Sequence, residues 1–134
     1  MQRFLTMRFL LVAALLLAAC GGTGTPAPSS SPTPIPGAGL VTRANDRGTV
    51  HARVGDRIQI ALGADYEWRL DPPDGVVLTR GVQNELLVRG TQAVWTASAP
   101  GTATIRATGT VICPSGQACI LIAILFETTV VVSP

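Results

Sequence analysis

The 134-residue chain contains no lysine and one histidine, and only 4% of its residues are aromatic. Beyond residue 20, eight arginines are balanced by eight acidic residues, and the two signs are interspersed along the chain. This balance excludes the one-signed basic surface with which proteins bind nucleic acid or anionic bilayers. The longest run of apolar residues, at positions 9–19, is too short for a membrane-spanning helix, which needs roughly 20 residues.

Catalytic side chains are also scarce. His51 falls at an outward position of a predicted strand, where an ordinary surface histidine is expected rather than a general base. The serines beyond the leader have no nucleophile-elbow sequence around them, and no glycine-rich loop is followed by a helix that would bind phosphate. The sequence therefore predicts a protein that is not an enzyme and uses no metal or cofactor.

The first 19 residues have the pattern of a bacterial lipoprotein signal peptide. A short positive segment, Met1 to Arg8, precedes the apolar run, which ends in Leu17-Ala18-Ala19-Cys20. This ending resembles a lipobox, which implies cleavage before Cys20 and acylation of its thiol, including palmitate. An ordinary secretory signal with a chance cysteine is the alternative. Two or more acyl chains anchor a protein stably. The mature protein is therefore predicted to lie on the outer side of the cell membrane, or on the outer membrane if the bacterium has two membranes.

Residues 20–39 form a predicted linker, and residues 40–134 a single predicted domain. The linker contains five prolines among Gly, Ser, Thr and Ala, with no apolar periodicity. Such a composition cannot bury enough apolar surface to fold, and its prolines favour an extended chain. We therefore expect a spacer that separates the domain from the membrane.

Within residues 40–134, apolar residues recur with period two between Gly- and Pro-rich turns. Ile58 and Ile60 make one such set, and Ala103, Ile105 and Ala107 another. Short alternating strands spaced in this way predict an antiparallel sandwich or a small barrel. We expect an all-β, immunoglobulin-like antiparallel sandwich of about seven strands.

Three further expectations concern particular parts of this domain. Trp68 and Trp95 are expected in the core between the sheets. Residues 85–89 are expected to form a short strand. The continuously apolar residues 120–126 fit a strand that is buried on both faces or that has one edge covered by a loop.

Two cysteines remain beyond the lipobox, and they lie six residues apart. An exported protein meets oxidising conditions, so we predict a Cys113–Cys119 disulfide that closes a hairpin tip. A metal site is the first alternative, but two cysteines and the distant His51 do not make four ligands. A redox pair is the second, and its usual spacing is C-x-x-C.

Loops at one end of the predicted sandwich are the candidate binding residues. The bridged loop contributes its tip, and two further turns are expected beside it. The candidate binding residues are Gly63, Ala64, Asp65, Gly81, Gln83, Asn84, Pro114, Ser115, Gly116 and Gln117.

Two stretches resemble the chagasin-like cysteine protease inhibitors, which have an immunoglobulin-like fold. Residues 54–62, followed by Tyr66-Glu67-Trp68, resemble the opening of those proteins, and residues 94–105 resemble a later aromatic strand and its Pro-Gly turn. The second stretch also resembles bacterial Ig-like repeats of surface and adhesion proteins. Chagasin-like inhibitors insert an Asn-Pro-Thr-Thr-Gly-like loop and an Arg-Pro-Trp loop into the protease cleft. This sequence has neither motif.

Three functions therefore remain open. The first is a lipid-anchored, non-catalytic Ig-like domain that presents loops to a protein or cell-envelope partner. The second, implied by the resemblance, is inhibition of papain-type cysteine proteases. The third is a structural or small-ligand accessory role.

Overall fold

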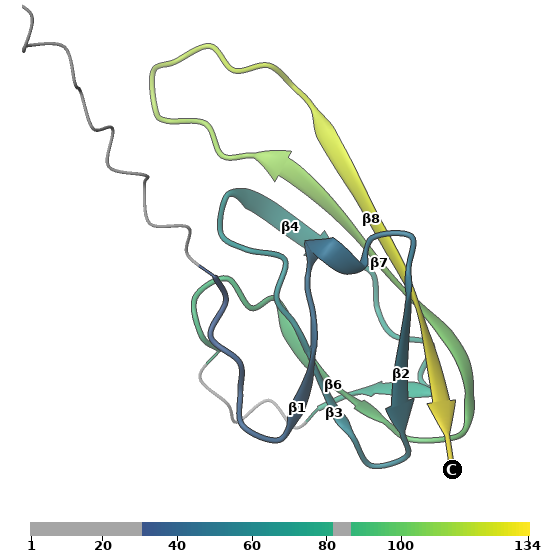
Figure 1. Cartoon of the computed structure of the whole chain (residues 1–134). Helices are drawn as coiled ribbons and strands as arrows, with labels where there is room; N and C mark the ends of the chain where they lie inside the picture. Colours follow the sequence, from purple (N-terminus) through teal and green to yellow (C-terminus); the bar gives the residue numbers. More distant parts are fainter. Residues whose placement is uncertain (1–30, 82–86) are drawn as a thin grey trace, which may run out of the picture.

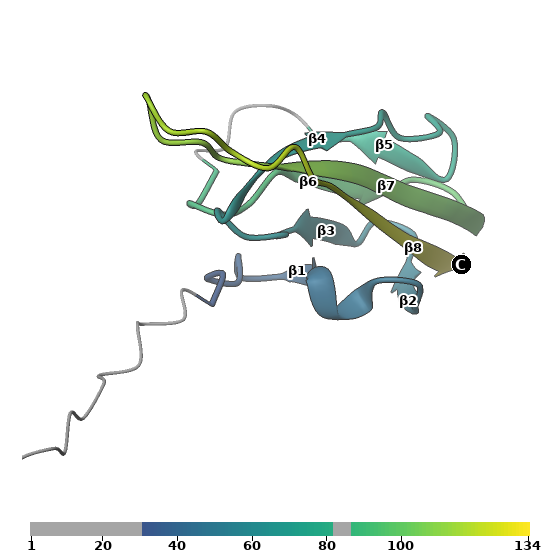
Figure 2. The same cartoon turned by 90° about the horizontal axis from the view of Figure 1, so that it is seen from above.

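The computed structural model describes residues 31–81 and 87–134, and nearly all of their regular structure is β-strand. The elements are β1 (Ala38–Val41), the short 3₁₀ helix η1 (Arg43–Asn45), β2 (Thr49–Arg53), β3 (Arg57–Ile60), β4 (Tyr66–Leu70), β5 (Leu78–Arg80), β6 (Ala93–Ala97), β7 (Gly101–Val111) and β8 (Ala123–Ser133). The strands form two four-stranded sheets (Figures 1 and 2). The predicted all-β sandwich is confirmed. No helix within the described residues is long and apolar enough to cross a membrane.

The strand order is β1-β3-β6-β5 in one sheet and β2-β8-β7-β4 in the other. Most pairs are antiparallel, but β1 pairs with β3 and β2 pairs with β8 in parallel. The expectation of a purely antiparallel sandwich was therefore incomplete. Between β1 and β2 the chain crosses from one sheet to the other through η1, which Thr42 caps. Because of this crossing, the N-terminal part of the chain adds an edge strand to each sheet.

The core lies between the sheets and is made by the alternating positions. Ile58 and Ile60 of β3 and Trp95 of β6 meet Ile105 of β7 and Phe126 of β8, all at most 4% exposed. Trp68 is partly buried and packs against this cluster. The expected core position is confirmed for Trp95, whereas Trp68 lies at the margin of the core. Buried aliphatic and aromatic side chains of this kind supply most of the free energy that stabilises a small domain.

The expectation for residues 120–126 was right in part: residues 123–126 lie in β8, but the expected burial on both faces is wrong. Residues 120–122 precede β8 and belong to no strand, and Leu121 and Leu125 are 99% and 75% exposed. Strands β7 and β8 have 11 residues each, whereas the strands of the other sheet have three to five, so no second sheet covers this end of the pair. Residues 85–89 were expected to form a strand. Residues 87–89 are not in one, and 85–86 lie outside the described residues.

The β7–β8 hairpin is paired continuously from Gly101↔Val132 to Thr110↔Ala123. Arg106 and Glu127 face each other on its outer surface, and Arg106 Nε lies 2.6 Å from Glu127 Oε2. The hydrogen bond and charge of Glu127 raise the pKa of Arg106 above its usual value. The pair is solvent-exposed, so it fixes the cross-strand register more than it adds stability.

Gly109 of β7 makes room for the ring of Trp68 on the neighbouring strand. A Cβ atom at position 109 would lie 2.8 Å from Trp68 Cζ3. We expect Gly109→Ala to lower the free energy of unfolding by about 1–3 kcal/mol, because the ring must shift within packed surroundings. Urea denaturation measures this, with Thr110→Ala on the outer face as the control. Equal effects of the two substitutions would show that the ring has room to move.

Candidate functional site: the loop end

Three connections meet at one end of the sandwich, which we call the loop end: residues 61–65 after β3, residues 87–92 before β6, and residues 112–122 between β7 and β8. The pairing of the strands places these three connections side by side. Gln92 N donates to Ile60 O, so the first two connections leave neighbouring strands of one sheet. Tyr66 pairs with Val111, so β4 begins beside the base of the hairpin. The first connection therefore lies between the other two.

Gln92 joins the first two connections through its side chain. Its Oε1 accepts a hydrogen bond from Leu62 N at 2.6 Å, and its Nε2 donates to Gly63 O at 2.8 Å. Gly63 N donates in turn to Gly90 O at 3.1 Å. The 61–65 loop is thus held by side-chain and backbone bonds, and it presents Ala64 and Asp65 to solvent.

Residues 112–122 continue the hairpin beyond the sandwich (Figure 1). The predicted Cys113–Cys119 disulfide is confirmed, and it ties the two arms together just behind the tip. Beside it, Ile112, Ile120 and Ile122 are 55%, 75% and 52% exposed. Surface apolar residues gathered in this way usually mark an interaction site.

The same hairpin carries no charge. From Ala107 to Phe126 the chain has no Asp, Glu, Lys or Arg, and the Arg106–Glu127 pair bounds this stretch at both ends. A partner that encloses the hairpin would therefore not need to desolvate any charge on it. Burying an unpaired charge is among the largest penalties in binding. The hairpin thus has the composition of a surface that becomes buried in a complex.

The predicted binding residues fall into three groups. The residues of the first loop, Gly63, Ala64 and Asp65, and those of the hairpin tip, Pro114, Ser115, Gly116 and Gln117, all lie at the loop end, and the tip residues are exposed. Gly81 lies elsewhere: it follows β5, bonds to Val94 O and lines a cavity on the side of the sandwich. Gln83, Asn84 and Cys20 lie outside the described residues.

The side chains whose types occur in catalytic sites are scattered over the described residues. His51 is exposed on β2, and Ser98 lies beside Thr79, with 2.6 Å between their hydroxyl oxygens. Within residues 31–81 and 87–134, no three His, Cys, Asp or Glu side chains gather to hold a metal ion.

Sequence reasoning missed two glutamines at the loop end. Gln92 is half-buried, and Gln59 in β3 is fully buried beside the apolar Ile58 and Ile60. The one available signal was a polar amide inside the apolar run 58–62, which needs buried hydrogen-bond partners.

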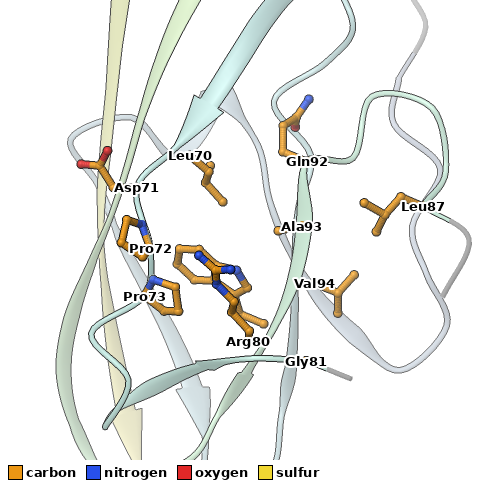
Figure 3. Close-up of a pocket in the computed structure, with 11 residues that line it drawn as sticks. Leu70, Asp71, Pro72, Pro73, Arg80, Gly81, Leu87, Gln92, Ala93 and Val94 are labelled. Carbon is orange, nitrogen blue, oxygen red and sulfur yellow. The ribbon is translucent and has the colours of Figure 1, made fainter. Parts of the chain in front are cut away.

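A cavity of about 280 Å³ lies on the side of the sandwich, where β4 ends near β5 and β6. Figure 3 shows Leu70, Pro72 and Pro73 on one side of it, Ala93 and Val94 on the other, and Arg80 between them. Its volume is at the lower limit for small-molecule pockets, and among the described residues that line it Arg80 and Asp71 carry a charge. The loop end carries more features of a binding site than this cavity does.

Removing the disulfide should loosen the tip before it affects the whole domain. We expect the double substitution Cys113→Ser with Cys119→Ser to make residues 112–122 a site of proteolytic nicking, and to lower stability by at most about 2.5 kcal/mol, the chain-entropy value for so short a loop. Limited proteolysis with mass spectrometry measures the first effect. The matched control is Ser115→Ala in the intact bridge. Equal nicking of the two variants would contradict the stiffening role of the bridge.

No family model and no curated protein matches the chain. Among solved structures, it is similar to the cysteine protease inhibitor EhICP2 from Entamoeba histolytica, with 16% identity and a TM-score of 0.48, over 71% of this chain and 94% of the inhibitor. It is also similar to amebosin, with 20% identity and a TM-score of 0.43, over 72% and 98% of the two chains. Both likenesses concern the fold alone.

Proposed function

We propose that this chain is a non-catalytic binding protein whose loop end enters the active-site cleft of a papain-type cysteine protease and inhibits it. The observation that carries the proposal is the hairpin at residues 112–122. It projects from a rigid sandwich, it is closed by a disulfide, and it exposes apolar residues on an uncharged stretch. A cleft can enclose such a hairpin from several sides, which a flat surface cannot.

The stiffness of the loop end favours binding. A loop that is already ordered loses little conformational entropy when it docks, and this loss is one of the main costs of association. The bridge orders the hairpin, and Gln92 orders the 61–65 loop beside it. A tied hairpin tip also resists cleavage, because the peptide bonds within the closed loop cannot extend into the conformation of a substrate.

The choice of protease class comes from the sequence. The segments at 54–62, 66–68 and 94–105 resemble the chagasin-like inhibitors. The first two adjoin the 61–65 loop, and the third follows the connection at 87–92. The loop motifs of that family are absent, so the contacts would be made by this chain's own residues, chiefly Ile120, Leu121 and Ile122. An apolar cleft is the surface that these three side chains fit.

The experiment is an inhibition titration of residues 21–134 against a panel of papain-type proteases. We expect competitive, sub-micromolar inhibition of at least one member and no effect on serine proteases of similar size. Absence of inhibition at high micromolar concentration across the panel would contradict the proposal. Crosslinking in cell envelopes would then address the broader prediction of an adhesion or envelope partner.

We further propose that Cys20 is acylated and anchors the mature chain to a membrane on its outer side. The lipobox sequence supports this, together with the linker that follows it. Radiolabelled palmitate should enter the wild-type protein and not a Cys20→Ala variant. Label in that variant, or no label in either protein, would contradict the anchor.

A further inference from the structure

The segment before β1 is fastened to the domain by one buried side chain. Gln59 is 0% exposed, and its Oε1 accepts a hydrogen bond from Ile35 N at 2.7 Å. Its Nε2 donates to Thr33 O at 3.0 Å and to Thr91 Oγ1 at 2.8 Å. Both amide hydrogens and the carbonyl oxygen of Gln59 therefore have partners. Two of these three bonds hold residues that the composition assigned to the linker.

The docked segment returns the chain to the loop end. Ala38 N donates to Ile35 O at 3.1 Å, and Gly37 has φ of 76°, so the chain reverses just before β1. Residues 31–33 then line a cavity of about 330 Å³ together with Gly63–Asp65 and Val88–Gly90. Figures 1 and 2 show the described chain starting at the end from which the hairpin projects, while the C terminus lies at the opposite end.

The tether between Cys20 and the docked segment is short, so the place where it joins the domain affects how the domain is oriented. Residues 21–30 separate Cys20 from the docked segment and, fully extended at about 3.1 Å per residue, span about 30 Å. The 11 residues of β8 span about 36 Å at roughly 3.3 Å per residue. The tether is thus shorter than strand β8, and it is attached at the loop end. A domain held in this way keeps its attached end nearer to the anchor than its free end.

We infer that Gln59 and the docked segment turn the loop end toward the membrane, so that the partner is a protein that itself lies at the membrane surface. This inference rests on the acylated Cys20 and on the loop end as the binding surface, both proposed above. It adds a restriction on the partner: the protease must itself lie beside the bilayer, within reach of a spacer of about ten residues.

The test measures which end of the tethered domain lies nearer to a bilayer. The mature chain, residues 20–134, is coupled through Cys20 to a maleimide lipid in phosphatidylcholine vesicles, with its α-amino group blocked and the other cysteines in their disulfide. Because the chain has no lysine, Ser115→Lys and Ser133→Lys each introduce a single side-chain amine, one at the tip and one at the opposite end. Each carries a fluorescent donor, and the vesicles carry a lipid acceptor.

We expect energy transfer to be about twofold or more stronger from position 115 than from position 133, because the two positions lie at opposite ends of the β7–β8 hairpin. In Gln59→Met the difference in energy transfer between the two positions should become smaller. Hydrogen exchange at the Ile35 amide should become faster, because its bond to Gln59 Oε1 is lost. The matched control Gln92→Met breaks the bonds to Leu62 and Gly63 only, so it should keep the difference.

Equal or reversed transfer from the two positions in the otherwise unchanged chain would overturn the inference, even if Gln59→Met does not fold. Quenching of the label at position 115 by lipids with brominated acyl chains would also overturn it, because the bilayer and not a protein would then occupy the hairpin. Inhibition is measured separately with the untethered chain. If the chain inhibits a protease but energy transfer from positions 115 and 133 is equal, the proposed function stands and only the inferred orientation of the domain is wrong.

Discussion

Leu121→Asp is expected to raise the inhibition constant for the target protease by about thirtyfold or more, the effect of losing a binding hot spot of about 2 kcal/mol. Leu121 is 99% exposed in the free domain, so the substitution removes no packing that the fold needs. In the complex, the new carboxylate would be buried in an apolar cleft without a partner. Inhibition kinetics with the purified variant measure the effect.

Val76→Asp is the matched control for this prediction. Val76 is also an exposed apolar residue, 67% accessible, but it lies in the turn between β4 and β5, at the end opposite the hairpin. This variant should inhibit like the wild type. Similar losses of inhibition in both variants would indicate a general effect of added charge. Full inhibition by Leu121→Asp would show that the hairpin is not part of the binding surface.

Trp95→Ala should have the largest effect on stability, a loss of about 3–5 kcal/mol in the free energy of unfolding. Trp95 lies in the middle of the central strand pair β3–β6, opposite Ile58, and is 4% exposed. Removing its indole leaves a cavity that strands on both sides cannot close. A domain of this size has a total stability of about 5–15 kcal/mol, so the variant should be close to unfolding at room temperature.

Urea denaturation followed by circular dichroism measures this loss. Trp95→Phe keeps an aromatic ring at the same position and should lose less, which provides a measurable variant if Trp95→Ala does not fold. Trp68 is partly buried, so the loss in the free energy of unfolding for Trp68→Ala should lie between those for Trp95→Phe and Trp95→Ala. A loss below about 1 kcal/mol for Trp95→Ala would contradict the position of Trp95 at the centre of the core.

Alternation was a reliable guide to the strands of this domain. Ile58 and Ile60, and Ala103, Ile105 and Ala107, are buried as their period of two predicts, because one face of each strand contacts the opposite sheet. The disulfide followed from export and from the count of thiols. These features depend on local sequence and composition, and for that reason they could be predicted.

Features that depend on distant parts of the chain could not be predicted in this way. Residues 120–125 are as apolar as a buried strand, and only the lengths of the other strands show that no second sheet covers them. Strand β1 lies partly in the Pro- and Gly-rich segment, and its parallel partner is about 20 residues away. Gln59 bonds to backbone and side-chain atoms 24 to 32 residues away, a distance at which no sequence period gives a signal.

The central claim is that the loop end occupies the cleft of a papain-type protease, and hydrogen exchange of the complex tests it most directly. Amide exchange of residues 21–134 is compared with and without the protease that the titration identifies as the strongest binder. We predict slowed exchange at residues 61–65, 87–92 and 112–122, and unchanged exchange in the turn at 71–77. Protection confined to the opposite end or to an outer sheet face, with the loop end unprotected, would contradict the account.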